Sequence, residues 1–158
     1  MRVYSITSST IKFACVLALC VITMCALVII VPSSSEAAGG TISYSEIYSN
    51  DDRVEFISKF GWTVDPTPVG EVEVEVPDVF DSAYASYNDI QTAQGLNLEK
   101  YKGKTVVRYT YGITNYENYD GTVYVNLLVY KNKIIGGDVS SADASGFVFG
   151  FSGEDQSF

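Results

Sequence analysis

Four side chains in the middle of the chain have types and spacing that suit a binding surface. Tyr101, Arg108, Tyr109 and Tyr111 lie close together in a segment that also carries several lysines. Tyrosine rings beside a guanidinium group are typical of faces that bind peptides or sugars. The structural alternative is that these tyrosines are good strand residues that bury a ring and expose a hydroxyl. The residue types favour the structural alternative, but we keep these four residues as candidate binding residues.

A fifth candidate, Asp138, follows a pair of glycines at Gly136 and Gly137. A glycine pair within a strand indicates a bulge or crowding by another part of the backbone. Asp138 could contact a ligand or act as a buried polar partner within the fold. The sequence favours the structural role for Asp138.

Three carboxylates alternate with valines at Glu71, Glu73 and Glu75. On a strand they would share one face at intervals of about 7 Å. Such a row of oxygen ligands could bind calcium, but a solvated sheet face is the commoner reason for it. No calcium-loop pattern occurs in the sequence, so we expect neither a metal site nor a cofactor.

The composition excludes several classes of function. The chain contains no histidine, which removes Ser-His-Asp and Cys-His catalysis and ordinary zinc sites. Its net charge is −9, which argues against binding nucleic acid or an anionic membrane surface. The three cysteines all lie in an apolar segment near the N-terminus, so the rest of the chain has no disulfide framework.

That apolar segment, residues 13–31, predicts the compartment. As a helix it would be about 28 Å long, close to the thickness of the hydrocarbon layer. Arg2 and Lys12 precede it, so residues 1–12 should be cytoplasmic and the C-terminal part extracytoplasmic. The alternative is a long signal peptide cleaved near Ala37, which would give a secreted protein. We favour a single-pass membrane anchor because the segment is longer than the usual signal-peptide core.

The sequence after residue 31 predicts a flexible tether at 32–48, an extracytoplasmic domain at 49–152 and a frayed tail at 153–158. Helical periodicity predicts helices over 51–60 and 79–94, with Asn50 and Asp78 as their N-caps. Alternating patterns predict strands over 71–76, 105–114, 122–130 and 133–139, and a last short strand near Phe147 to Phe151. The expected fold is α+β, with two helices packed on one face of an antiparallel sheet of about four to five strands.

Four short motifs within residues 53–150 also stand out together. They are Phe60-Gly61-Trp62; Tyr87-Asn88 with Gln91 and Gln94-Gly95; Leu98 with Lys100-Tyr101-Lys102-Gly103; and Ile135-Gly136-Gly137-Asp138. The chain thereby resembles the domain of unknown function 4830 family, small proteins of clostridial-type Gram-positive bacteria that often carry one N-terminal membrane segment. The resemblance implies a single domain behind a membrane anchor and transfers no catalytic residue.

We therefore expect a non-catalytic binding or interaction module of the cell envelope. Its expected partners are the lipid bilayer, through residues 13–31, and an envelope protein. One alternative is a structural accessory subunit of a membrane assembly. Another is a carboxylate-based hydrolase of wall glycans, in which Asp138 would pair with Glu71 or Glu73 at a spacing of about 5–9 Å.

Overall fold

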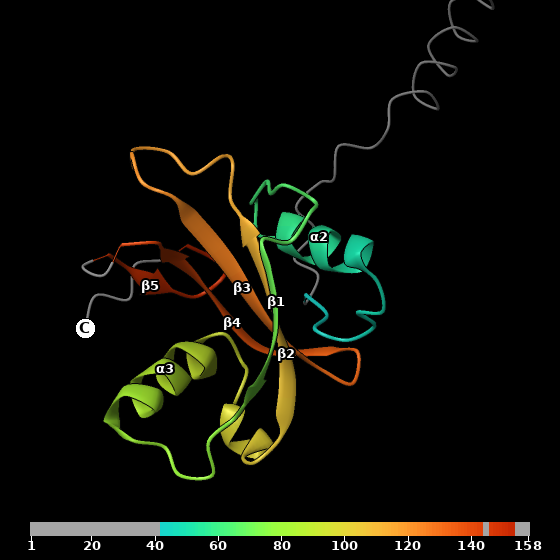
Figure 1. Ribbon diagram of the computed structural model, residues 1–158, viewed down its shortest axis with the longest axis vertical. Coiled ribbons are helices and arrows are strands. Elements are labelled where there is room, and N and C mark those ends of the chain that lie inside the picture. Colours follow the sequence, from blue (N-terminus) through green and yellow to red (C-terminus); the bar gives the residue numbers. More distant parts are fainter. Residues whose placement is uncertain (1–41, 144–145, 154–158) are drawn as a thin grey trace, which may run out of the picture. The chain divides into compact units, whose positions relative to one another are not determined.

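The computed structural model describes residues 42–143 and 146–153. The predicted membrane segment at 13–31 lies outside these residues, and no helix within them is long and apolar enough to cross a bilayer. The elements follow in the order α2 (Asn50–Ser58), β1 (Gly70–Glu75), α3 (Ser82–Ala93), η1 (Leu98–Tyr101), β2 (Thr105–Gly112), β3 (Val123–Tyr130), β4 (Lys133–Ser141) and β5 (Val148–Phe149) (Figure 1).

The five strands form one antiparallel sheet in which neighbours in the sequence are neighbours in space. This confirms the predicted α+β class and antiparallel sheet. The β3–β4 hairpin turns at Lys131 and Asn132, whose φ angles of 47° and 61° match the primed turns that suit twisted strands. Ile135 is the extra residue of a bulge just before Gly136, as the glycine pair predicts.

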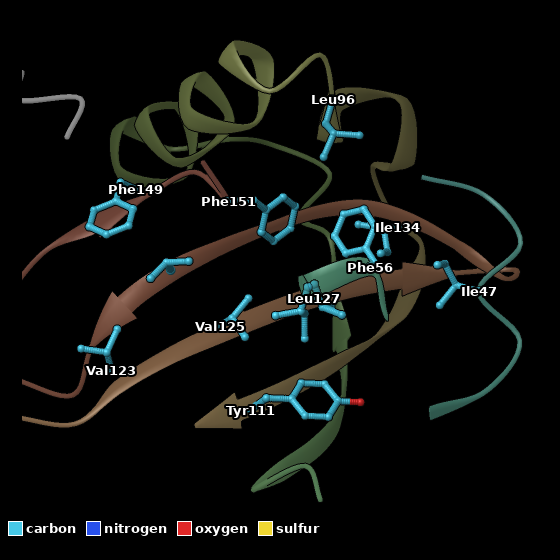
Figure 2. Packing of buried hydrophobic residues seen from close by; sticks show 12 residues of the cluster. Ile47, Phe56, Leu96, Tyr111, Val123, Val125, Leu127, Ile134, Phe149 and Phe151 are labelled. Carbon is cyan, nitrogen blue, oxygen red and sulfur yellow. The ribbon is translucent and has the colours of Figure 1, made fainter. Parts of the chain in front are cut away.

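The two helices cover opposite faces of the sheet. Adjacent residues of β3 show this, because Leu127 belongs to one hydrophobic core and Leu128 to a second. Phe56 of α2 packs in the first core (Figure 2), and Tyr84 of α3 borders the second. The prediction that both helices lie on one face is therefore wrong. Since β3 is apolar on both faces, each face needs its own cover to exclude water.

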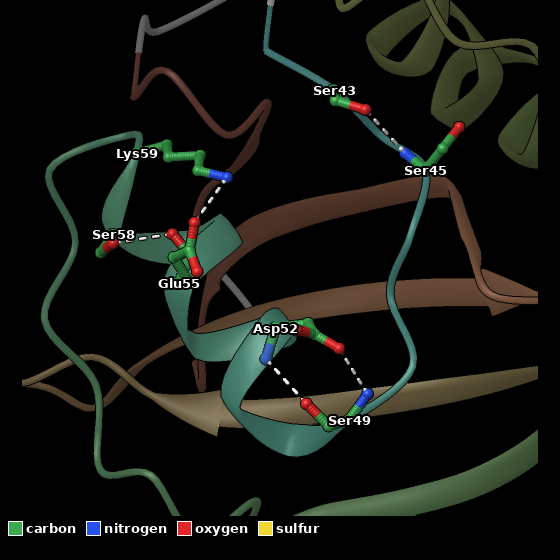
Figure 3. A network of polar contacts seen from close by, with 7 residues as sticks. All are labelled: Ser43, Ser45, Ser49, Asp52, Glu55, Ser58 and Lys59. Carbon is green, nitrogen blue, oxygen red and sulfur yellow. Dashed lines mark hydrogen bonds and ion pairs between the residues drawn. The ribbon is translucent and has the colours of Figure 1, made fainter.

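A capping box begins α2 (Figure 3). The backbone N–H of Asp52 donates to the Ser49 hydroxyl at 3.2 Å, and the Asp52 carboxylate accepts from the Ser49 N–H at 2.7 Å. Ser49 is thus the N-cap, where Asn50 was predicted. Asn50 is instead the first helical residue, and its side-chain oxygen accepts the Tyr111 hydroxyl at 3.0 Å. This bond links the start of α2 to the sheet.

The second helix, α3, begins later than predicted. Asp81 is its N-cap, and its carboxylate accepts the Tyr84 N–H at 2.7 Å. The predicted cap, Asp78, lies in a bend with Val79, and Phe80 precedes the helix outside regular secondary structure. The Phe80 ring packs on Tyr84 with 4.6 Å between the ring centroids. Phe80, which lies before the helix, packs against the second core.

Three different segments cover the outer edge of β4. At one end, Ser45 forms a bridge with Lys133, and the Ile47 N–H donates to the Asn132 carbonyl at 3.0 Å. Two side chains of α3 follow in the middle, and β5 pairs at the far end. The compact unit begins at Ile42, so residues 42–48 of the predicted tether pack on the domain, with Ile47 buried.

The opposite edge of the sheet is β1, which pairs only with β2 within the part of the chain that the structure describes. Its valines lie on the α3 face, in register with Val106 and Arg108. Val76, just after β1, is buried, whereas Val72 is 48% exposed. The α3 face is therefore covered at the Val76 end and open at the Val72 end. The candidate site lies at the boundary between the two.

Candidate functional site

Two glutamines hold α3 against the edge of β4. The Gly137 N–H donates to Gln91 Oε1 at 2.8 Å, and the Gly137 carbonyl accepts from Gln94 Nε2 at 3.1 Å. Gln94 Oε1 also accepts the Phe151 N–H at 2.6 Å. Gln91 is completely buried, so these bonds are shielded from water. The side chains thus replace a neighbouring strand at the point where β5 no longer pairs.

Gly137 has no room for a side chain where α3 meets β4, and Gly136 beside it is closely packed. A methyl group on Gly137 would overlap the Asn126 carbonyl oxygen and the Phe151 ring, and one on Gly136 would lie 3.0 Å from a Leu98 methyl carbon. The sequence prediction of backbone crowding at this pair is confirmed. Close packing at the two glycines leaves Asp138 directly under α3.

A row of hydrogen-bonded polar side chains crosses the sheet and ends on α3. Strand register places Thr110, Asn126 and Asp138 opposite one another on β2, β3 and β4. The Thr110 hydroxyl donates to Asn126 Oδ1 at 2.8 Å, and Asn126 Nδ2 donates to Asp138 Oδ1 at 2.9 Å. The Tyr87 hydroxyl of α3 donates to Asp138 Oδ2 at 2.9 Å. Each oxygen of the carboxylate therefore accepts a hydrogen bond from an uncharged group.

The surroundings of Asp138 alter its acidity. Asp138 is only 6% exposed. Burial raises the pKa of its carboxyl group, while hydrogen bonds from Asn126, Tyr87 and Ser140 and the charge of Arg108 act in the opposite direction. Burial and the nearby Asp138 charge also raise the pKa of the Tyr87 hydroxyl well above its usual value. Tyr87 therefore stays protonated at neutral pH and remains a hydrogen-bond donor to Asp138.

Beside this row lies a hollow of about 380 Å³, which we call the α3 pocket. It spans the sheet from β1 to β5 and has one wall on α3. Its lining residues are Val74, Glu75, Tyr84, Tyr87, Arg108, Asn126, Leu128, Asp138 and Val148. The volume falls in the range of about 300–1,000 Å³ typical of small-ligand sites.

Arg108 and Asp138 are the two predicted candidates that the structure brings together. Both line the α3 pocket, Asp138 buried and Arg108 exposed. Arg108 forms no hydrogen bond or ion pair with any residue that the structure describes, although its charge acts on Asp138. Its planar set of N–H donors is therefore available to a ligand.

The three candidate tyrosines lie elsewhere. Tyr109 is on the opposite face of β2, where the Arg53 guanidinium stacks 3.8 Å above its ring centroid. Tyr111 is fully buried in the first core, under α2 (Figure 2), and its hydroxyl accepts a hydrogen bond from Arg53 Nε at 2.7 Å. Tyr101 lies beside Tyr130, at 5.7 Å between ring centroids, next to the second core. These surroundings fit the structural alternative, in which the tyrosines pack their rings within the fold.

Sequence reasoning missed Tyr84, Tyr87 and Asn126 as pocket residues. Tyr84 and Tyr87 follow the helical spacing of a buried stripe, which gave no sign of a ligand. Asn126 is the one amide among the apolar and aromatic residues of β3, and that exception was an available signal. Its pairing with Asp138 depends on strand register, which the sequence alone does not give.

In the part of the chain that the structure describes, the acidic residues form neither a metal site nor the carboxylate pair of the alternative hydrolase hypothesis. Glu71 and Glu73 are in register with Tyr109 and Val107, on the face opposite Asp138. The pairing considered for a glycan hydrolase is therefore excluded by the pleat of the sheet. Among residues 42–143 and 146–153, no three acidic, histidine or cysteine side chains lie close enough to hold a metal ion.

The fold and the site together define an α+β domain with a mixed polar and apolar pocket between a helix and an antiparallel sheet. Comparison with protein families matches residues 56–139 to a domain of unknown function (DUF4830), which is more than half of the chain. The chain belongs to this family, as the sequence motifs indicate. The matched region includes the two glutamines, the glycine pair and Asp138. The comparisons with curated proteins and with solved structures gave no match.

Proposed function

We propose that this protein is a non-catalytic binding module of the cell envelope that holds its ligand in the α3 pocket. The observation that carries the proposal is the exposed, unpaired Arg108 guanidinium beside the buried Asp138 carboxylate, in a hollow of ligand size. The statement about Arg108 pairing refers to the described residues only. Polar groups converging in a preformed concave site are the usual mark of ligand recognition.

The chemistry of the pocket favours binding over catalysis. Asp138 is held by two uncharged donors, and its partners fix it in one orientation. Glu71 and Glu73 lie on the other face of the sheet, so they cannot act with it as paired carboxylates. The chain has no histidine to move a proton at neutral pH.

We further propose that residues 13–31 anchor the protein in the membrane and place the domain outside the cell. The support is the uninterrupted apolar sequence of these residues, preceded by Arg2 and Lys12. Intact-mass analysis of the protein extracted from membranes tests this. The anchor predicts a mass that includes residues 13–31, whereas a chain beginning at Ala38 would show cleavage and refute it.

The binding role can be tested by capture of soluble envelope fragments. Full-length protein would be immobilised and incubated with an enzymatic digest of the cell envelope, and retained compounds would be identified by mass spectrometry. Arg108→Ala removes the free guanidinium of the pocket. Lys59→Ala is the matched control, because Lys59 is an exposed cation of α2 whose partner is Glu55, on the opposite face.

The proposal predicts a compound that wild type and Lys59→Ala retain, that Arg108→Ala loses, and that is recovered chemically unchanged. Retention of the same compounds by all three proteins would contradict a binding role for the pocket. Recovery of a shortened or altered compound would show catalysis instead. A protein captured equally by all three forms would point to a structural accessory subunit and against the proposal.

A further inference from the structure

The charges around the α3 pocket limit the ligands it can take. Its lining contains one cation, Arg108, and one buried carboxyl group, Asp138; Glu75 also borders it, but strand alternation places the Glu75 side chain with Glu71 and Glu73 on the other face of the sheet. The chain as a whole has a net charge of −9. A purely anionic ligand would bind Arg108 but would be repelled by the Asp138 carboxylate and by the net negative charge of the protein. The lining therefore favours a ligand that also carries positive charge.

The Asp138 carboxylate has unused acceptor capacity. Its oxygens accept hydrogen bonds from Tyr87 and Asn126, and the Ser140 hydroxyl also acts on the carboxyl group, whereas an ionised carboxylate offers about four acceptor positions. It has no ion-pair partner among the residues that the structure describes. A buried carboxylate without a cation is costly, so a ligand ammonium group would gain binding energy there.

The aromatic wall of the pocket supports the same placement. Tyr84 and Tyr87 lie with their ring centroids 5.9 Å apart, and both line the pocket beside Asp138. The faces of tyrosine rings attract organic cations. Aromatic rings beside a buried carboxylate thus form a subsite suited to an ammonium group.

Arg108 provides the complementary subsite. Its side chain is exposed at the pocket and lies on β2, one strand away from Asn126 and two from Asp138. A planar guanidinium binds a carboxylate through two parallel hydrogen bonds. A ligand with one anionic and one cationic group would therefore pair its anionic group with Arg108 and its cationic group with Asp138.

We propose that the α3 pocket binds a zwitterionic ligand of the amino-acid or short-peptide class, with its ammonium group at Asp138 and its carboxylate at Arg108. This proposal deepens the proposed binding function and rests on it. The hollow of about 380 Å³ is at the small end of ligand sites, in keeping with such a molecule.

The test is isothermal titration of the full-length protein with three dipeptides. Alanyl-alanine carries both charges, its N-acetyl derivative lacks the ammonium, and its C-terminal amide lacks the carboxylate. The free dipeptide should bind at least about tenfold more tightly than either derivative, as expected for the loss of a charged hydrogen bond. Lys59→Gln and Glu73→Gln, on exposed charges outside the pocket lining, serve as controls and should bind like wild type.

Two variants assign each charge to its subsite. Arg108→Gln should bind the free dipeptide and the amide equally, because the carboxylate has lost its partner. Asp138→Asn should likewise lose the preference for the free amino group over its acetyl derivative. A structural effect alone would weaken all three compounds together, so loss of one preference at a time identifies direct contacts.

The other outcomes overturn the proposal in distinguishable ways. If the three dipeptides bind wild type equally, the zwitterion proposal is wrong while the pocket remains a binding site. If none binds, the zwitterion proposal also fails, and the Arg108-dependent capture of envelope fragments decides the proposed function separately. If the controls weaken binding as much as the pocket variants, the recognition is non-specific electrostatics and the proposal is refuted.

Discussion

Replacing Gln91 with leucine should destabilise the protein by about 1–3 kcal/mol. Gln91 is fully buried, and its Oε1 accepts the Gly137 N–H at 2.8 Å and Gln94 Nε2 at 3.2 Å. Leucine has a similar volume but cannot accept a hydrogen bond, so the variant leaves the Gly137 N–H buried without a partner. Such a group costs about 1–3 kcal/mol, and the substitution leaves little cavity to add to it.

Urea unfolding of the full-length protein, followed by the fluorescence of its single tryptophan, measures this loss. Trp62 reports on the fold because its Nε1–H donates to the Phe151 carbonyl at 2.6 Å. Asp89→Leu places the same residue at an exposed position of α3 and should change the free energy of unfolding by less than about 0.5 kcal/mol. A Gln91→Leu variant as stable as this control would refute the role assigned to the glutamine pair.

Three further predictions concern the two faces of the sheet. Gly137→Ala should destabilise by at least about 1–3 kcal/mol, since the added methyl overlaps Asn126 and Phe151; Gly112→Ala, whose methyl meets nothing within 4 Å, should not, and equal melting temperatures would contradict this. Tyr111→Phe should lose about 1 kcal/mol or more in urea unfolding, because its hydroxyl bonds to two α2 side chains, yet leave ligand capture by the opposite face unchanged. Burial raises the pKa of Asp138 in the folded protein. The contribution of the protonated carboxyl group to stability is therefore complete below its unfolded pKa of about 3.9, and it is lost as the pH rises through the pKa of the folded protein. The unfolding free energy of wild type should therefore fall relative to Asp138→Asn as pH rises from about 4, and parallel curves would contradict it.

Much of the sheet could be predicted because alternation in sequence has a direct structural cause. The predicted strand at 105–114 corresponds to β2, and the predicted strands at 122–130 and 133–139 correspond to β3 and β4. The positions of the helices were harder to predict. The apolar residues on both faces of β3 indicate that both faces of the sheet need cover, but helical periodicity does not say which face a helix will cover.

The site was predictable only in part. Strand periodicity separates Arg108 from its neighbours Tyr109 and Tyr111, so their division between two faces follows from the sequence. Bringing Arg108 near Asp138 required the register of three strands. The two-residue hairpin turn and the bulge at Ile135 determine the register of β4 on β3, whereas β2 and β3 are joined by a longer loop at 113–122. The contact with Tyr87 required the docking of α3, which depends on long-range hydrogen bonds to Gly137. Long-range contacts of this kind have no local sequence signature.

The most direct test of the central claim is an NMR titration of the ¹⁵N-labelled full-length protein with a soluble digest of the cell envelope. Binding in the α3 pocket predicts that shifted amide signals cluster at Val74, Tyr87, Arg108, Asn126 and Asp138, which come from α3 and four different strands. Signals confined to the α2 face of the sheet, or no shifts at all, would contradict the claim.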